Sequence, residues 1–307
     1  MPLPNTPYQI AVVQATPVLF DLAASIQKVA KWTQEAKVQG ASLALFPEAF
    51  LPCYPRGLGF GTVVGSRSPE GRDVWQRYFE NALEIQIGNP HFDQLAQIAR
   101  EQQLYLAIGV IERSGGTLYC TFLILDPAGK LIYHHRKLKP TAAERIIWGE
   151  GRGDDLQVVD TNLGKLGGLI CWENYMPLAR MALYEQQIEL YLAPTADQRD
   201  RWQSSMQHIA LEGRCFVVAC NQFVRKSDYP EEYQAELAPQ PEIMSRGGSV
   251  VFSPLGERLA GPLWDEEGIL MAEIDPSLIA QSKLDFDVVG HYARPDVFDY
   301  VYRFSDI

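Results

Sequence analysis

The sequence lacks the features of exported and membrane proteins. Its first residues carry no basic stretch followed by an apolar run, so they do not resemble a secretory signal. No uncharged apolar stretch approaches the roughly 18 residues that a membrane-spanning helix needs. The five cysteines are odd in number, scattered, and form no C-x-x-C pair. That pattern is typical of free thiols in a reducing compartment, so we expect a cytoplasmic protein without a membrane partner.

The sequence also has fewer basic than acidic residues. The chain of 307 residues has 27 lysines and arginines against 38 aspartates and glutamates, a net charge of -11. This excess of negative charge repels phosphates and argues against a nucleic-acid partner. The glycine-rich segment Gly149–Gly153 resembles a phosphate loop, but it precedes an expected strand instead of opening a helix. We therefore expect no nucleotide cofactor.

Histidine is scarce, and none of the five lies in a motif for metal binding or for a cysteine–histidine pair. They are His91, His134, His135, His208 and His291. The adjacent pair at 134 and 135 falls in an expected strand, where successive side chains point to opposite faces. The pair is thus a poor metal site, and we expect no metal.

Apolar residues make up 47% of the chain and charged residues 21%, which is the balance of a globular protein. Strand and helix patterns alternate without a repeat or a linker, so we expect one α/β domain spanning residues 1–307, with helices covering sheets too apolar to face water. Strands are expected at 10–14, 43–46, 104–111, 118–125, 130–135, 156–159, 166–171, 190–193, 216–221, 250–253, 258–260 and 269–274.

Helices are expected after Asp21, after Asn89-Pro90, and over residues 176–187 and 202–214. Asp21 and Asn89 are of the residue types that cap helix N-termini, and proline fits the first helical position. Residues 57–88 are harder to assign. We expect them to form an inserted surface loop with a short helix over residues 73–82.

Cys171 lies in a place suited to a nucleophile. It ends an apolar run and is followed directly by Trp172-Glu173-Asn174 and an expected helix. A sharp strand-to-helix turn exposes its apex side chain and directs backbone N–H groups at it. Those conditions lower the pKa of a thiol and stabilise an oxyanion, so we expect a reactive thiol. A buried cysteine that only packs as a small apolar residue is the alternative.

Lys137 lies at the end of an expected strand, in the segment HHRKLKP. The period of two puts Lys137 and His135 on one face, opposite His134 and Arg136. A lysine that points inward beside a thiol would hold the negative charge of a tetrahedral intermediate. A solvated basic run is the alternative.

Two glutamates are candidates for proton transfer. Glu48 is an isolated carboxylate within the apolar run LFPEAF, where it is costly to bury unless paired. Desolvation would raise its pKa and allow it to act as general base and acid. Glu144, in the segment PTAAER, is the weaker candidate because loops commonly contain a Glu-Arg pair.

Three of these segments together resemble the catalytic segments of the nitrilase superfamily, and they occur in the family's order. They are FPEAF with Glu48, HRKLKPT with Lys137 and GGLICWENYMPL with Cys171. The resemblance extends from about Ile10 to the C-terminus, with further matching segments at 141–153, 193–195, 210–221, 247–259 and 287–298. Within the superfamily, the segments CWEN, ERIIWGEG and GHYARPDVF are similar to those of nitrilases proper.

The resemblance implies a four-layer αββα sandwich, no metal or organic cofactor, and paired subunits. It implies a Glu–Lys–Cys triad at Glu48, Lys137 and Cys171, with Glu144 at the position of the family's second glutamate. The implied reaction converts a small-molecule nitrile into a carboxylic acid and ammonia through a thioimidate and a thioester, with the Trp172 backbone N–H helping to hold the intermediate. Because the chain ends soon after Phe298, we expect a homodimer or other discrete homo-oligomer and not a long filament.

Two alternatives to a nitrilase stay open. One is a hydrolase of the same fold that acts on amides or on cyanide, and the other is a binding protein that has lost its activity. The filled triad positions favour an enzyme. The substrate pocket is expected to include the residues within or beside the matching segments, although each could instead pack in the core. These residues are Tyr54, Trp148, Trp172, Tyr175 and Pro194.

Overall fold

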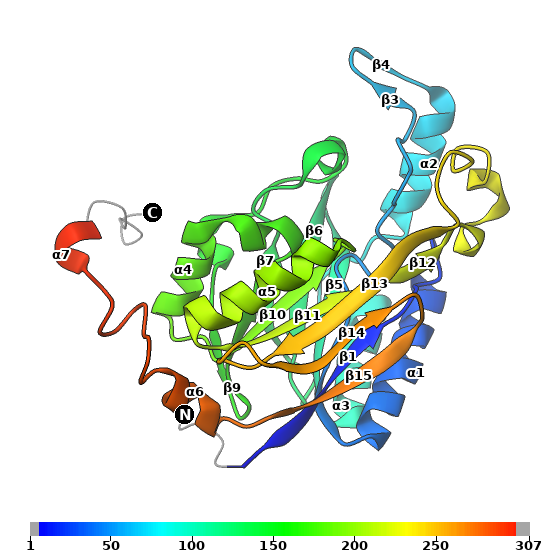
Figure 1. Ribbon diagram of the computed structural model, residues 1–307. Helices are drawn as coiled ribbons and strands as arrows, with labels where there is room; N and C mark the ends of the chain where they lie inside the picture. The colour runs from blue at the N-terminus through cyan, green and yellow to red at the C-terminus, as the bar shows by residue number, and fades with distance from the viewer. Residues whose placement is uncertain (1–5, 299–307) are drawn as a thin grey trace.

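The structure, a computed structural model, describes residues 6–298 and contains two large β-sheets packed face to face (Figure 1). Helices cover the outer face of each sheet, so the layers run helix, sheet, sheet, helix. The predicted αββα sandwich is confirmed. Among the described residues, no helix is both long enough and apolar enough to cross a membrane.

The first sheet has six strands in the order β15-β1-β2-β5-β6-β7. Its last strand in sequence pairs antiparallel with its first, so residues 8–14 and 268–274 lie side by side in one sheet. Helices α1 (Leu22–Val38) and α3 (Pro90–Gln102) pack on its outer face. The strands are β1 (Tyr8–Gln14), β2 (Ala41–Leu45), β5 (Tyr105–Ser114), β6 (Thr117–Leu125), β7 (Leu131–Arg136) and β15 (Gly268–Ile274).

The second sheet has seven strands, in the order β12-β13-β11-β10-β9-β8 with β14 beside β13. Helices α4 (Pro177–Glu185) and α5 (Asp200–Gly213) cover its outer face. The strands are β8 (Val159–Thr161), β9 (Gly164–Gly168), β10 (Leu190–Thr195), β11 (Phe216–Asn221), β12 (Phe223–Arg225), β13 (Ile243–Phe252) and β14 (Arg258–Trp264).

The alternation of side chains along the strands explains the layers. In β1, Ile10 and Val12 point into the space between the sheets, whereas Ala11 and Val13 point towards the helices. In β10, Leu192 points between the sheets and Ala193 towards the helices. Because both faces of each sheet are buried, these strands appear in the sequence as continuous apolar runs.

The predicted helix caps are confirmed. The Asp21 carboxylate accepts the N–H of Ala24, and the Asn89 side chain accepts the N–H groups of His91 and Phe92. These bonds satisfy backbone donors that have no partner within the first turn of a helix. The caps fix where α1 and α3 begin.

Residues 57–88 contain more structure than expected. They form a two-stranded hairpin, β3 (Thr62–Val63) and β4 (Ser66–Arg67), followed by α2 (Pro69–Glu80). The helix begins earlier than predicted because the Ser68 hydroxyl caps it by accepting the N–H of Gly71. Figure 1 shows the hairpin and α2 at one edge of the molecule, above the sheets.

Two predicted strands are misplaced. The strand expected at 156–159 keeps only its last residue, since a 3₁₀ turn at Gly153–Asp155 precedes β8. The strand expected to end at Cys171 ends at Gly168 instead. The nucleophile candidate therefore opens a 3₁₀ helix, Cys171–Tyr175, that leads into α4. The remaining short elements are 3₁₀ turns at Ala142–Ile146, Lys226–Asp228 and Glu231–Tyr233, and helices α6 (Ser277–Ser282) and α7 (Pro295–Phe298).

Candidate active site

The structure brings the three residues of the predicted triad together between the two sheets. Glu48 follows β2 and Lys137 follows β7 in the first sheet, while Cys171 follows β9 in the second. Glu48 and Lys137 are fully buried, and Cys171 is 5% exposed. The three side chains thus leave their strands at the carboxyl ends, which is where α/β folds commonly bind ligands.

Lys137 lies between two carboxylates. Its Nζ is 2.6 Å from Oε1 of Glu48 and 2.8 Å from Oε2 of Glu144. Burial alone lowers the pKa of Lys137, but the charge of Glu48 and of other nearby groups outweighs it and holds that pKa well above its ordinary value. The ammonium therefore keeps its charge at neutral pH.

The two carboxylates differ in their remaining contacts. Both oxygens of Glu144 are occupied, because Oε1 accepts the Tyr54 hydroxyl at 2.6 Å and Oε2 accepts the Thr141 N–H at 2.6 Å as well as Lys137. These bonds fix the carboxylate in one orientation. Glu144 thus orients the ammonium of Lys137.

Glu48 has an oxygen to spare. Its Oε1 binds Lys137 and lies 3.6 Å from the Cys120 thiol, whereas Oε2 is buried without a hydrogen-bond partner among the described residues. Burial raises the pKa of Glu48, and the charge of Lys137 offsets only part of that effect. A carboxylate with a raised pKa and a free oxygen can accept a proton.

Gly109 explains how the Glu48 segment reaches this position. A β-carbon at Gly109 would lie 2.6 Å from Cα of Glu48 and 2.4 Å from the Pro47 carbonyl oxygen. The glycine N–H also donates to that carbonyl. Because β5 carries no side chain there, the backbone before Glu48 can pack directly on the strand.

Three residues at or beside the catalytic candidates have left-handed backbone conformations. The φ angles are 48° at Ala49, 48° at Ala142 and 52° at Cys171. Residues other than glycine rarely adopt positive φ, and such strained positions gather at functional sites. At Cys171 the turn points the side chain between the sheets.

The Cys171 sulfur accepts a hydrogen bond from a threonine that sequence reasoning missed. Oγ1 of Thr195, at the end of β10, lies 3.2 Å from Sγ. The same oxygen accepts the N–H of Asp197 at 2.9 Å. Since that N–H occupies a lone pair of the hydroxyl, the hydroxyl proton is free to point at the sulfur.

The expectation of a lowered thiol pKa is wrong. Burial raises the pKa of Cys171, the charge of Glu48 raises it further, and Lys137 and Thr195 offset only part of the increase. The thiol is therefore protonated at rest. A neighbouring base must remove its proton as the sulfur attacks, and the geometry offers Glu48 for that task.

Glu173 connects the segments of Lys137 and Cys171, a role that the sequence did not predict. Its carboxylate accepts the N–H of Ile170 at 2.6 Å and the N–H of Leu138 at 2.6 Å. It also lies 3.0 Å from Nε2 of His135. One buried side chain thus joins the residue before the cysteine to residues on both sides of the lysine.

The alternation predicted along β7 is confirmed. His135 and Lys137 are fully buried on the inner face. His134 and Arg136 point the other way and both bind Glu112. The two adjacent histidines therefore have different carboxylate partners and do not converge.

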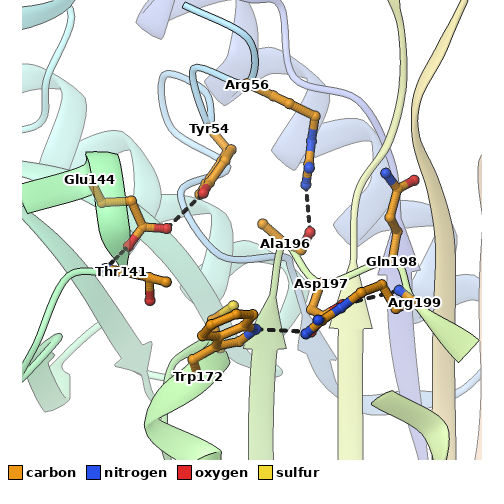
Figure 2. Close-up of a pocket in the computed structure, with 10 residues that line it drawn as sticks. Tyr54, Arg56, Thr141, Glu144, Trp172, Ala196, Asp197, Gln198 and Arg199 are labelled. Atoms are coloured by element: carbon orange, nitrogen blue, oxygen red, sulfur yellow. Dashed lines mark hydrogen bonds and ion pairs between the residues drawn. The ribbon is translucent and has the colours of Figure 1, made fainter. Parts of the chain in front are cut away.

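A pocket of about 340 Å³ opens over Cys171 (Figure 2). Of the five predicted pocket residues, Tyr54 and Trp172 line it. The others lie nearby: Trp148 packs against Tyr54 and Lys137, Tyr175 against Trp172, and Pro194 is buried within β10. The remaining lining residues are Arg56, Thr141, Glu144, Ala196, Asp197, Gln198 and Arg199.

Polar contacts fix one wall of this pocket. The Trp172 indole N–H donates to Asp197 at 2.9 Å, and Arg199 forms an ion pair with the same carboxylate. Arg56 donates to the Ala196 carbonyl at 2.5 Å. Sequence reasoning missed Arg56, Asp197 and Arg199. The contacts of Asp197 with Trp172 and of Arg56 with Ala196 join segments that are distant in the sequence.

Comparison with known proteins gives the family. The sequence profile described as Carbon-nitrogen hydrolase matches residues 9–284. The chain belongs to the carbon–nitrogen hydrolase family. It is 50% identical over 297 residues to an aliphatic nitrilase of Sinorhizobium fredii, covering 96% of each chain. It is 49% identical over 300 residues to Nitrilase 1 of Arabidopsis thaliana, covering 96% of this chain and 86% of the relative. Within the family, the chain belongs to the nitrilase branch.

Solved structures support the fold. A carbon–nitrogen hydrolase from Helicobacter pylori superposes with a TM-score of 0.75 at 20% identity, covering 97% of this chain and 99% of that one. A nitrilase-superfamily member of Saccharomyces cerevisiae has a TM-score of 0.73 at 20% identity, with 94% and 97% covered. At this identity the likeness concerns the fold alone.

Proposed function

We propose that the protein is a nitrilase that converts an organic nitrile and two water molecules into a carboxylic acid and ammonia, with Cys171 as the nucleophile. The observation that carries this proposal is that Glu48, whose Oε2 has no hydrogen-bond partner among the described residues, interacts with the buried, protonated thiol of Cys171. The similarity to relatives named nitrilases supports the choice of substrate.

The first step forms the covalent bond to the enzyme. Glu48 takes the thiol proton as the Cys171 sulfur attacks the nitrile carbon, and the proton passes to the nitrile nitrogen to give a thioimidate. Without a base the step would be slow, because a thiol with a raised pKa holds very little thiolate at neutral pH. Thr195 stabilises the negative charge that develops on sulfur by its hydrogen bond.

The later steps add water twice. Glu48 takes one proton from the first water as it adds to the thioimidate and passes it to the imine nitrogen, giving a tetrahedral intermediate with a hydroxyl and an amino group. Glu48 then transfers the hydroxyl proton to the amino nitrogen as the C–N bond breaks, so ammonia departs and a thioester remains. A second water adds in the same way, the C–S bond breaks, and the proton returns to sulfur as the acid leaves. The Lys137 ammonium, held by Glu48 and Glu144, provides a fixed positive charge for both tetrahedral intermediates.

Ammonia release from a panel of nitriles and their matching amides tests the proposal. We expect nitriles to be turned over and the Cys171→Ala variant to be inactive while folded. Intact-mass measurement during turnover should show an acyl adduct on the wild-type protein. Faster turnover of amides would replace the nitrilase assignment by an amidase, and activity in Cys171→Ala would remove the proposed nucleophile.

We also propose that residues 1–307 form one domain and that the protein assembles as a homodimer or higher homo-oligomer in the cytoplasm. The pairing of β15 with β1 supports a single domain.

Met176, Leu178 and Leu211 expose 38%, 48% and 38% of their surface on the outer helical layer, which supports pairing of subunits through that layer. All five cysteines are buried free thiols, which suits a reducing compartment. Light scattering tests the assembly, and a monomer would contradict it.

A further inference from the structure

Arg56 is a cation that faces the active-site pocket, and within residues 6–298 it has no carboxylate partner. It lies in the loop after β2, is half-buried, and lines the same pocket as Cys171. Figure 2 shows its side chain entering from the side opposite Trp172. One N–H donates to the Ala196 carbonyl, and the Tyr54 ring lies 5.3 Å from the guanidinium carbon. No described residue forms an ion pair with it.

The other charged groups that line the pocket already have partners. Arg199 is paired with Asp197. Burial raises the pKa of the Asp197 carboxyl, but the hydrogen bonds and the charge of Arg199 outweigh burial, and the pKa is lowered. Glu144 is occupied by Lys137, Tyr54 and the Thr141 N–H. Of the charged residues that line the pocket, Arg56 is thus the one without an ion-pair partner in the described part of the chain. A guanidinium has five N–H donors arranged to match a carboxylate, and Arg56 uses one of them on Ala196.

The distribution of charge also orients a ligand. The buried end of the site holds two carboxylates and a single ammonium, so it repels an anionic group. The protein as a whole is acidic, with a net charge of -11, so a free cation in a pocket is a local exception that attracts anions. An anionic nitrile would place its nitrile at Cys171 and its charge towards Arg56.

We propose that Arg56 binds a carboxylate carried by the substrate, so that the pocket selects ω-cyano carboxylates over neutral nitriles. This inference rests on the proposed nitrilase activity. Binding of a carboxylate to Arg56 would add a charged hydrogen bond that neutral nitriles do not form, and this raises kcat/KM mainly through a lower KM.

The test compares cyanoacetate and its longer ω-cyano homologues, each against its own carboxamide, by following loss of the nitrile. The carboxamide matches the carboxylate in size and removes the charge. For the best chain length we expect wild-type kcat/KM to favour the carboxylate by about tenfold to a hundredfold. Arg56→Met should abolish the preference, and Arg56→Lys should retain part of it. Arg72→Met, on the exposed side of α2, is the matched control and should keep the full preference.

The outcomes separate this inference from the activity on which it rests. If no nitrile in either series is consumed, the proposed function fails. If nitriles are consumed but the wild type treats carboxylates and carboxamides alike at every length, the role of Arg56 fails and the nitrilase stands. Should Arg56→Met not fold, rising salt must weaken the wild-type preference for carboxylates, since an ion pair at a half-buried cation is screened. A preference that is insensitive to salt would then overturn the proposal.

Discussion

The imidazole of His135 and the carboxylate of Glu173 form a fully buried pair, with Nε2 3.0 Å from Oε2. The same carboxylate accepts the backbone N–H groups of Leu138 and Ile170. Since Leu138 follows Lys137 and Ile170 precedes Cys171, the pair sets the distance between Lys137 and Cys171. Glu173 is thus a positioning residue that connects the two sheets at the active site.

Replacing Glu173 by glutamine should destabilise the protein and reduce its activity. The variant keeps the shape but removes the charge facing His135 and turns one acceptor oxygen into a donor that faces backbone N–H. Removing one partner of a buried ion pair costs about 3 kcal/mol or more of unfolding free energy. Urea unfolding measures this loss. Glu185→Gln, on the exposed face of α4, is the control, and an equally small effect in both variants would contradict the role of Glu173.

The His135–Glu173 pair should also make stability depend on pH. Burial lowers the pKa of His135, but the charge of Glu173 outweighs it and raises the pKa above its ordinary value of 6.5. A group with a raised folded pKa contributes stability that is complete below the unfolded pKa and is lost as pH rises through the folded pKa. The unfolding free energy should therefore fall as pH rises above about 6.5. His135→Gln should remove this component of the slope, and an unchanged slope would count against the pair.

Thr195 should tune the reactivity of Cys171. Thr195→Val keeps the shape and removes the hydroxyl that donates to sulfur, so the pKa of the thiol should rise further. A hydrogen bond of this kind is worth about 1 kcal/mol, which predicts a fall of about fivefold in the rate of alkylation by iodoacetamide at a fixed pH. Thr195→Ser retains the hydroxyl and should behave like the wild type. If valine and serine variants react alike, the hydroxyl has no such role.

Glu48 should set the acid limb of the pH–rate profile. The base must be ionised to take the thiol proton, and burial raises the pKa of its carboxyl above the ordinary 4.5. As pH falls, kcat/KM should therefore decline at a higher pH than an exposed carboxylate would produce. Glu48→Gln should lower kcat by about a hundredfold or more and remove this limb. An acid limb that persists in a residually active Glu48→Gln protein would assign it to another group.

Gly109→Ala should impair catalysis at a position that does not touch substrate. The added methyl group would lie 2.6 Å from Cα of Glu48 and must displace that segment, because the nearest atoms are backbone. Overpacking of this kind costs about 1–3 kcal/mol and moves the base. We expect a large fall in kcat in protein that still folds, measured with the best nitrile. Gly116→Ala, where a β-carbon meets nothing within 4 Å, is the control.

Most strands could be predicted from the sequence because they depend on local patterns, whereas the four-layer sandwich and the proposed triad were implied by the resemblance to the nitrilase superfamily. Continuous apolar runs indicate buried strands, and the period of two along β7 placed His135 and Lys137 together correctly. The link from Glu173 to His135 could not be predicted, because it joins residues that approach only when the sheets pack. The free oxygen of Glu48 is likewise a property of the assembled site.

The raised pKa of the Cys171 thiol could not be predicted from its neighbours in the sequence. A strand-to-helix turn favours a thiolate, which led to the expectation of a lowered pKa, and the nearby lysine acts in the same direction. The folded protein adds desolvation and the negative charge of Glu48, and together these outweigh Lys137 and raise the pKa of the thiol. The sequence identifies the neighbours of Cys171, but the balance of their effects depends on burial.

The left-handed backbone at Ala49, Ala142 and Cys171 has a consequence for engineering. Each such residue costs of order 1–3 kcal/mol relative to an unstrained conformation, and glycine would relieve that cost. At position 171, glycine would adopt the left-handed conformation without strain, but it has no thiol. A laboratory selection for thermal stability alone would therefore favour variants that lack the Cys171 thiol. Screens for a more stable enzyme must therefore measure turnover together with stability.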